Sequence, residues 1–217
     1  MFGGAIPLVF NLILWSTCYA AVSKPFWVNP QGKDSNDCGE SRATACKTLA
    51  YTVSHRAKGN QNKAQIYMLP GTYVHNFLTL FDEFQELNIS GFNPSATAVR
   101  ITCAGAQNTL SFDAIPRIFL DNISITDCHS PTNLNGGAVS VSRSGLHLRN
   151  VIVANSTSIG NTFVGGNGGC VAATSQSTVF VRNSTFVNCT TTGRGGALFV
   201  DVQSTTDLKV CVILFST

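Results

Sequence analysis

The 217-residue chain has few charged residues and no cluster of basic ones. Asp, Glu, Lys and Arg together make up 12% of the sequence, and the formal net charge of +3 is spread along its length. A protein that binds nucleic acid gathers Lys and Arg into a basic surface that neutralises phosphates. The sequence therefore predicts no nucleic-acid partner.

Acidic residues are absent from the most regular part of the chain. No Asp or Glu lies between His129 and Val200. Two-carboxylate hydrolysis and calcium-dependent lyase chemistry both require carboxylates gathered at one site. The sequence also lacks the Cys-x-x-Cys and His-rich spacings of zinc sites. We therefore predict no catalytic residue, no metal site and no cofactor.

Trp and Tyr are absent from the same region. Neither residue occurs after Tyr73, although sugar-binding surfaces commonly present these side chains for stacking. The glycine run GGNGG at 165–169 lacks the Lys-Ser/Thr pair of a phosphate-binding loop. We assign four phenylalanines to packing in the interior or at turns: Phe163, Phe186, Phe199 and Phe215.

The chain opens with the apolar segment MFGGAIPLVFNLILWSTCYA, residues 1–20. Gly3, Gly4, Pro7 and Asn11 interrupt it, whereas a transmembrane helix needs about 20 apolar residues. We interpret residues 1–20 as a cleaved signal peptide, which implies a secreted protein or one on the extracellular surface. The alternative is an uncleaved anchor, so a membrane partner is expected only if this segment is retained.

Two sequence elements repeat along the second half of the chain. The first is IFLDNISITDC (118–128), LHLRNVIVANS (146–156) and VFVRNSTFVNC (179–189). The second is GGAVSV (136–141), GGCVAA (168–173) and GGALFV (195–200). The offsets of 27 to 33 residues fall within the period of stacked repeats, and the units contain strands without helices. We therefore predict an all-β parallel β-helix in which each repeat forms one rung.

Inward and outward positions exchange at the Asn that the first repeated element shares. Ile118 and Leu120 precede it with one parity, and Ile123 and Ile125 follow with the other. A left-handed Asn backbone can turn the chain between two strands, and paired glycines suit corners where stacked backbones approach closely. The predicted corner residues are Asn122, Asn150, Asn183, Gly136, Gly137, Gly168, Gly169, Gly195 and Gly196.

Five Asn-x-Ser/Thr sequons support an extracellular location. They begin at Asn88, Asn122, Asn155, Asn183 and Asn188. An asparagine bonded into a corner ladder is a poor glycan acceptor, which disfavours Asn122 and Asn183. We therefore predict glycosylation at Asn155, Asn188 and Asn88.

The cysteine count is odd once the predicted leader is removed. Eight cysteines become seven without Cys18, so at least one thiol is free or paired outside the chain. Cys38 and Cys46 flank a short loop, which favours a local disulfide; the alternative is two unpaired thiols. Cys128 and Cys189 occupy equivalent repeat positions, and we interpret them as a stack of small buried side chains, with inter-rung disulfides as the alternative.

We assign residues 21–63 to an N-terminal cap and residues 64–217 to the rungs. Leu49, Val53 and Ala57 recur at four-residue steps, which predicts a short amphipathic helix over 46–57. The sequence finishes on the apolar strand DLKVCVILFST without a polar capping segment. We therefore expect the β-helix to be truncated at its C-terminus, with a coil that continues in a partner chain as the alternative.

One outward face carries charged and aromatic residues. An acid and two arginines occupy the same outward position on successive predicted rungs, and we interpret them as an exposed ion pair, with a catalytic pair as the alternative. His147 shares this face with two phenylalanines, and we interpret it as a solvated side chain. The residues concerned are Asp121, Arg149, Arg182, His147, Phe119 and Phe180.

The repeats resemble those of the right-handed parallel β-helix proteins called pectin-lyase-like. STFVNCTTTGRGGALFV, residues 184–200, is particularly similar to the GGA-type repeats of polymorphic outer membrane proteins and of secreted eukaryotic β-helix proteins. Asn188 stands one residue earlier than in the bacterial pattern, which favours the eukaryotic variant. The resemblance covers about residues 26–215 and implies a right-handed parallel β-helix with a short capping helix. It implies little about activity, because the fold hosts lyases, hydrolases, esterases and adhesins.

These observations together predict a secreted or cell-surface, non-catalytic β-helix protein with a role in adhesion or another extracellular interaction. The expected partners are an extracellular glycan or a cell-surface protein. The alternative is a polysaccharide-active, pectin-lyase-like enzyme whose active site is degenerate or lies outside this sequence.

Overall fold

The computed structural model describes residues 24–57, 63–74, 78–103, 110–130, 134–160, 165–201 and 203–214. The predicted signal peptide lies outside the described residues, as do Phe163 and Phe215. Among the described residues, no helix has the length and apolar character needed to cross a membrane.

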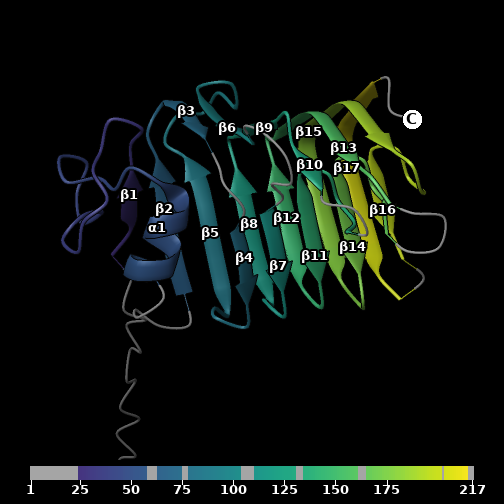
Figure 1. Cartoon of the computed structure of the whole chain (residues 1–217), viewed down its shortest axis with the longest axis horizontal. Coiled ribbons are helices and arrows are strands. Elements are labelled where there is room, and N and C mark those ends of the chain that lie inside the picture. The colour runs from purple at the N-terminus through teal and green to yellow at the C-terminus, as the bar shows by residue number, and fades with distance from the viewer. Residues whose placement is uncertain are drawn as a thin grey trace, which may run out of the picture.

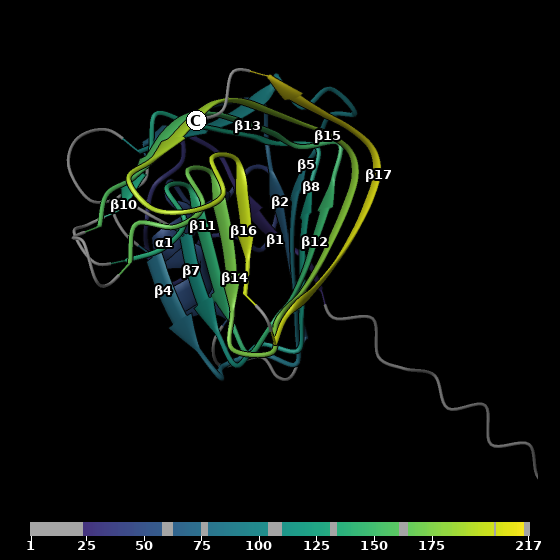
Figure 2. The same cartoon turned by 90° about the vertical axis from the view of Figure 1, so that its right-hand side faces the viewer.

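The described chain consists mainly of two parallel sheets, and the larger sheet has two sides that meet at a corner (Figures 1 and 2). Side A contains β1 (Phe26–Val28), β2 (Lys63–Met68), β5 (Glu86–Gly91), β8 (Arg117–Asp121) and β12 (Gly145–Arg149). Side B contains β3 (Gly71–Val74), β6 (Val99–Thr102), β9 (Ser124–Thr126), β10 (His129–Ser130) and β13 (Ile152–Ser158). The long strands β15 (Thr178–Thr191) and β17 (Thr205–Leu214) run through both sides.

Side C is the separate five-stranded sheet, which faces the curled larger sheet across the core (Figure 2). It contains β4 (Leu78–Phe81), β7 (Leu110–Asp113), β11 (Val139–Ser142), β14 (Val171–Thr174) and β16 (Leu198–Val200). The larger sheet is curled as a half-barrel, and this arrangement of parallel sheets is compatible with a parallel β-helix.

The aligned repeats pair with one another in the predicted register. Leu146 of β12 lies opposite Ile118 of β8 on one side and Val179 of β15 on the other. The inward positions of these strands are fully buried, as are Ile123 and Ile125 beyond the corner. The repeat spacing therefore stacks apolar side chains of successive repeats into a continuous core.

The helical segment is shorter than predicted. The sequence predicts a helix over 46–57, whereas the structure contains α1 (Leu49–Tyr51) followed by a π-helical turn, η1 (Thr52–Ala57). Asp34 Oδ1 accepts hydrogen bonds from the backbone N–H groups of Lys47 and Thr48, at 2.8 and 3.0 Å. Thr48 then accepts from the N–H of Tyr51 and caps the helix. These bonds hold residues 46–48 out of the helix.

The predicted corner residues have the backbone geometry that their residue types suggested. Asn122, Asn150 and Asn183 have φ values of 54°, 53° and 48°, in the left-handed region that Asn tolerates. In the Gly-Gly pairs the first glycine has a positive φ, which is 68° at Gly168. A Cβ on the second glycine of that pair, Gly169, would overlap the carbonyl oxygen of Gly196 on the next repeat. The two glycines therefore serve different purposes, one conformational and one steric.

Three disulfides occur among the described cysteines. Cys38 and Cys46 are bonded to each other, as the local spacing predicted. Cys103 is bonded to Cys128, and Cys170 to Cys189, while Cys211 is free. Cys128 and Cys189 are fully buried, and Ser156 lies opposite Cys189. Cys128 and Cys189 therefore belong to a buried row of small side chains, as predicted. Each of them also forms a disulfide, but with a cysteine outside this row.

Candidate functional site

The outward surface of side A carries a column of three stacked aromatic rings. Phe119 of β8, His147 of β12 and Phe180 of β15 are opposite one another in the strand register. Both neighbouring pairs of ring centroids are 4.6 Å apart, with interplanar angles of 22° and 14°. The ring spacing matches the separation of parallel strands, which is about 4.8 Å. Both faces of the His147 ring and one face of each phenyl ring are therefore covered within the column, and the ring edges point outward.

A row of charged side chains runs beside the ring column. Arg149 binds Asp121 through two hydrogen bonds, Nε to Oδ1 at 3.1 Å and Nη2 to Oδ2 at 2.8 Å. The predicted ion pair is thus present, but the prediction that it is exposed holds only for the arginine, because the carboxylate of Asp121 is buried. Arg182 lies opposite Arg149 on the next strand and makes no ion pair with any described residue.

The two rows line a groove of about 440 Å³, which Glu86 and Asn88 of β5 extend. Five cationic and three acidic side chains belong to the strands of side A around it. All three carboxylates are in ion pairs: Glu86 with Arg117 and Lys63, Asp121 with Arg149, and Asp207 with Lys209. Side A consequently has an excess of positive charge around the groove, although the two acids and two arginines that line the groove itself balance. Each of these acids has a cationic partner.

His147 is half-buried between the two phenyl rings, so its interpretation as a solvated side chain is wrong. Burial is the main cause that lowers the pKa of His147. Arg182 and Arg117 act in the same direction, whereas the carboxylate of Asp121 opposes them. A neutral imidazole is the favoured form near neutral pH, and it both stacks and offers one N–H donor and one acceptor.

A second aromatic cluster lies at the N-terminal end of side A. Trp27 of β1 contacts Tyr67 of β2, with ring centroids 5.1 Å apart, and Phe92 just after β5, at 5.0 Å. The guanidinium carbon of Arg42 lies 3.9 Å from the Phe92 ring centroid and 4.8 Å from that of Trp27. In this cluster, unlike in the ring column, ring faces contact a cation, because the Arg42 guanidinium covers the faces of Phe92 and Trp27.

The sequence repeats place Phe119 and Phe180 on the face of His147, but no role was predicted for them. A sugar-binding groove was not supported, because Trp and Tyr are absent after residue 73. The outward parity of Phe119 and Phe180 in the aligned repeats was the signal that could have identified the column.

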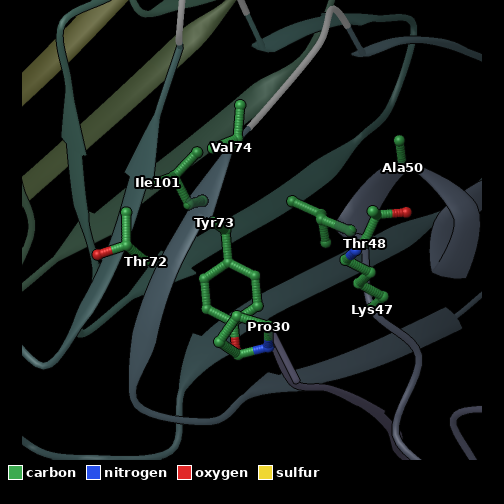
Figure 3. A pocket seen from close by; sticks show the side chains of 9 residues that line it. Pro30, Lys47, Thr48, Ala50, Thr72, Tyr73, Val74 and Ile101 are labelled. Atoms are coloured by element: carbon green, nitrogen blue, oxygen red, sulfur yellow. The ribbon is translucent and has the colours of Figure 1, made fainter. Parts of the chain in front are cut away.

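Another cavity, of about 410 Å³, lies between the cap and side B (Figure 3). Its walls are mainly apolar, and the ring of Tyr73 stands beside Pro30 with Thr48 and Ala50 opposite. The hydroxyl of Tyr73 donates to backbone carbonyl oxygens of Leu69 and Val28, at 2.6 and 3.0 Å. Burial raises the pKa of Tyr73, so this hydroxyl has a structural role and the cavity offers little chemistry.

Two possible ion sites are accounted for by other bonds. The side chains of Asp34, Cys38 and Cys46 converge, but the two sulfurs form a disulfide and Asp34 holds the start of the helix. In the run at 165–169, the N–H groups of Gly166, Gly168 and Gly169 donate to neighbouring backbone carbonyl groups. These N–H groups are therefore not available to cradle a phosphate.

The predicted glycan acceptors lie in different environments. Asn88 is half-buried on β5, inside the groove, and accepts a hydrogen bond from Ser90. Asn155 and Asn188 are exposed, but both belong to a ladder: Asn188 Nδ2 donates to Asn155 Oδ1, and Asn155 Nδ2 donates to Asp127 Oδ1. The expectation that these two asparagines stand outside a ladder is wrong.

Comparisons with protein-family models, curated proteins and solved structures find no match to this chain. The resemblance to pectin-lyase-like proteins and to GGA-type repeats therefore remains a prediction from the sequence.

Proposed function

We propose that this chain is a right-handed parallel β-helix protein, secreted or displayed on the cell surface, that binds an extracellular glycan along side A without catalysing a reaction. The observation that carries the proposal is the strip of aromatic and cationic side chains on the outward surface of side A. The disulfides support an oxidising, extracellular compartment.

An extended polymer suits the strip better than a compact ligand. The register places outward side chains of side A in rows across successive strands, from Trp27 and Tyr67 at one end to Arg182 and Lys209 at the other. A glycan chain lying along this direction meets the Arg42 guanidinium over the Trp27 cluster and hydrogen-bonding groups in the groove. Ring edges carry partial positive charge, so the ring column favours oxygen-rich groups.

A binding role is favoured over catalysis because the acidic groups are committed. Glu86 contacts two cations, and Asp121 is buried in a two-bond pair with Arg149. Hydrolysis by two carboxylates requires one acid that holds a proton and another that is free. The strip therefore supports recognition more directly than bond cleavage.

A glycan-binding assay on the purified protein tests the proposal. Oligosaccharide panels that contain neutral and acidic chains are titrated by calorimetry against the wild type, Phe180→Ala and Arg182→Ala. The matched control is Phe81→Ala, because Phe81 is 60% exposed on side C. We expect at least a tenfold weaker affinity for the two groove variants and an unchanged affinity for the control. Equal losses in all three variants, or binding of no glycan, would contradict the proposal.

The second candidate is a polysaccharide-active enzyme, favoured only by the neutral His147 beside Arg182 in the groove. Assaying the same oligosaccharides for new reducing ends or unsaturated products separates the two functions. Product formation that His147→Gln abolishes would replace the binding proposal with this one.

A further inference from the structure

Two rows of left-handed asparagines mark two bends of the chain, and they contain four of the five sequon asparagines. The first row is Asn122, Asn150 and Asn183, at the corner between sides A and B. The second row is Asp127, Asn155 and Asn188, farther along side B, with φ values of 60°, 50° and 49°. Among the asparagines of these two rows, Asn183 alone has a side chain that makes no hydrogen bond with any described residue, and this difference distinguishes the sequons.

The second row is a complete ladder that ends on a carboxylate. Asn188 Nδ2 lies 3.1 Å from Asn155 Oδ1, and Asn155 Nδ2 lies 3.2 Å from Asp127 Oδ1. Burial, the largest single effect, raises the pKa of Asp127, but hydrogen bonds from Thr126, Arg100 and Asn155 together lower it. The carboxylate is therefore ionised at neutral pH and is a strong acceptor at the base of the ladder. A sugar on either Asn155 or Asn188 would replace one N–H of an amide that holds the ladder.

The first row is incomplete, and Asn183 is the member left out. Asn150 Nδ2 donates to Asn122 Oδ1 at 2.7 Å and to the carbonyl oxygen of Pro94 at 2.6 Å. Asn183 is exposed, and its side chain makes no hydrogen bond with any described residue. Asn122 and Asn88, in contrast, are half-buried. Asn183 is therefore the sequon asparagine whose amide is both accessible and uncommitted.

We infer that Asn183 is the main N-glycosylation site of this protein, in preference to Asn155, Asn188 and Asn88. The site rests on the proposed extracellular location, because the modification occurs in the secretory pathway. The Asn183 amide nitrogen bonds to the anomeric carbon of a lipid-pyrophosphate-linked oligosaccharide. The lipid pyrophosphate leaves, and the nitrogen loses one proton. The product places the glycan at the outer corner of β15, immediately after Arg182.

Expression in a eukaryotic secretory host tests this site. The full chain is produced with its own N-terminus and, in parallel, behind a heterologous signal peptide. Occupied asparagines are converted to aspartate by a peptide glycosidase in heavy-oxygen water and located by peptide mass spectrometry. We expect Asn183 to show the highest occupancy.

Matched variants separate loss of the site from loss of folding. Asn183→Gln removes the acceptor, whereas Thr185→Ala destroys the sequon but keeps the left-handed asparagine. Each should remove one glycan from the intact mass, and Asn155→Gln and Asn188→Gln should leave that glycan in place. Higher occupancy at Asn155 or Asn188 than at Asn183, or an unmodified Asn183 behind the heterologous signal peptide, would overturn the inference.

The two expression arms distinguish this failure from failure of the proposed location. Secretion with an unmodified Asn183 rejects the site and leaves the extracellular proposal intact. Retention of the chain with its own N-terminus, combined with a modified Asn183 behind the heterologous signal, rejects the location and supports the site.

Discussion

The corners of the chain and the outward surface of side A differ in how far the residue type is repeated from one repeat to the next. At the corners the residue type recurs, with Asn at 122, 150 and 183 and Gly-Gly at 136, 168 and 195. On side A the residue type changes from Asp121 to Arg149 and from Phe119 to His147, although the backbone register is unchanged. The residue type recurs where the backbone conformation or the close approach of another strand restricts it. It varies where the side chain points outward and can take part in binding.

The largest loss of stability is expected when one methyl group is added at a corner. Gly169→Ala places a Cβ within 2.6 Å of the backbone nitrogen of Thr190 and overlaps the carbonyl oxygen of Gly196. Backbone atoms of stacked strands have little room to move, so we expect a loss of roughly 3 kcal/mol or more in the free energy of unfolding. Urea denaturation followed by circular dichroism measures it.

The matched variant for this test is Phe180→Ala on side A, which deletes far more atoms. The Phe180 ring is half-exposed and stacks on one neighbour, His147, so its removal should cost only about 1 kcal/mol. A larger cost for Phe180→Ala than for Gly169→Ala would reverse the distinction between corner and surface.

A smaller effect is expected at the asparagine corner. Asn150→Ala should destabilise the protein by about 2 kcal/mol, since alanine is strained in the left-handed region and two hydrogen bonds are lost. Asn150→Gly should recover the backbone part, about 1 kcal/mol. Equal stability of the alanine and glycine variants, measured by the same denaturation, would show that the left-handed backbone is not what selects asparagine.

The smallest effect is a pH dependence that originates on side A. The lowered pKa of His147 means that the unfolded chain takes up its proton at a higher pH than the folded chain does. The stability contributed by neutral His147 is therefore fully present above the ordinary histidine pKa, about 6.5, and falls as the pH decreases below it. Urea midpoints at pH 7.5 and 5.5 should differ more for the wild type than for His147→Phe, and an equal difference in the two proteins would contradict this prediction.

The sequence predicted the corners and the strand register because both depend on local backbone requirements. A gap-free alignment of 118–128 with 146–156 and 179–189 was enough to pair Leu146 with its two neighbours. Positive φ at the shared Asn followed from the exchange of parity on either side of it. Neither result required knowledge of distant contacts.

The features that were wrong or left open depend on groups far away in the sequence. The helix begins at Leu49 because Asp34, 14 residues before Thr48, holds the preceding backbone. The partner of Cys128 is Cys103, which lies outside both repeated elements, and the partner of Cys189 is Cys170, which belongs to the other repeated element. Likewise, the ladder of Asn155 and Asn188 is completed by Asp127, at a position where the residue type changes. The candidate site was therefore less predictable than the fold.

The uninterrupted course of β15 around the corner affects how the protein fluctuates. β8 and β9 are separate strands, as are β12 and β13, whereas β15 continues through Asn183 and pairs with both β12 and β13. Opening of its side A half must strain the hydrogen bonds of its side B half. Amide hydrogens on the two halves of β15 should therefore exchange with solvent together, while those of β12 and β13 can exchange at separate rates. Opening of the groove at Phe180 and Arg182 is therefore coupled to opening of side B.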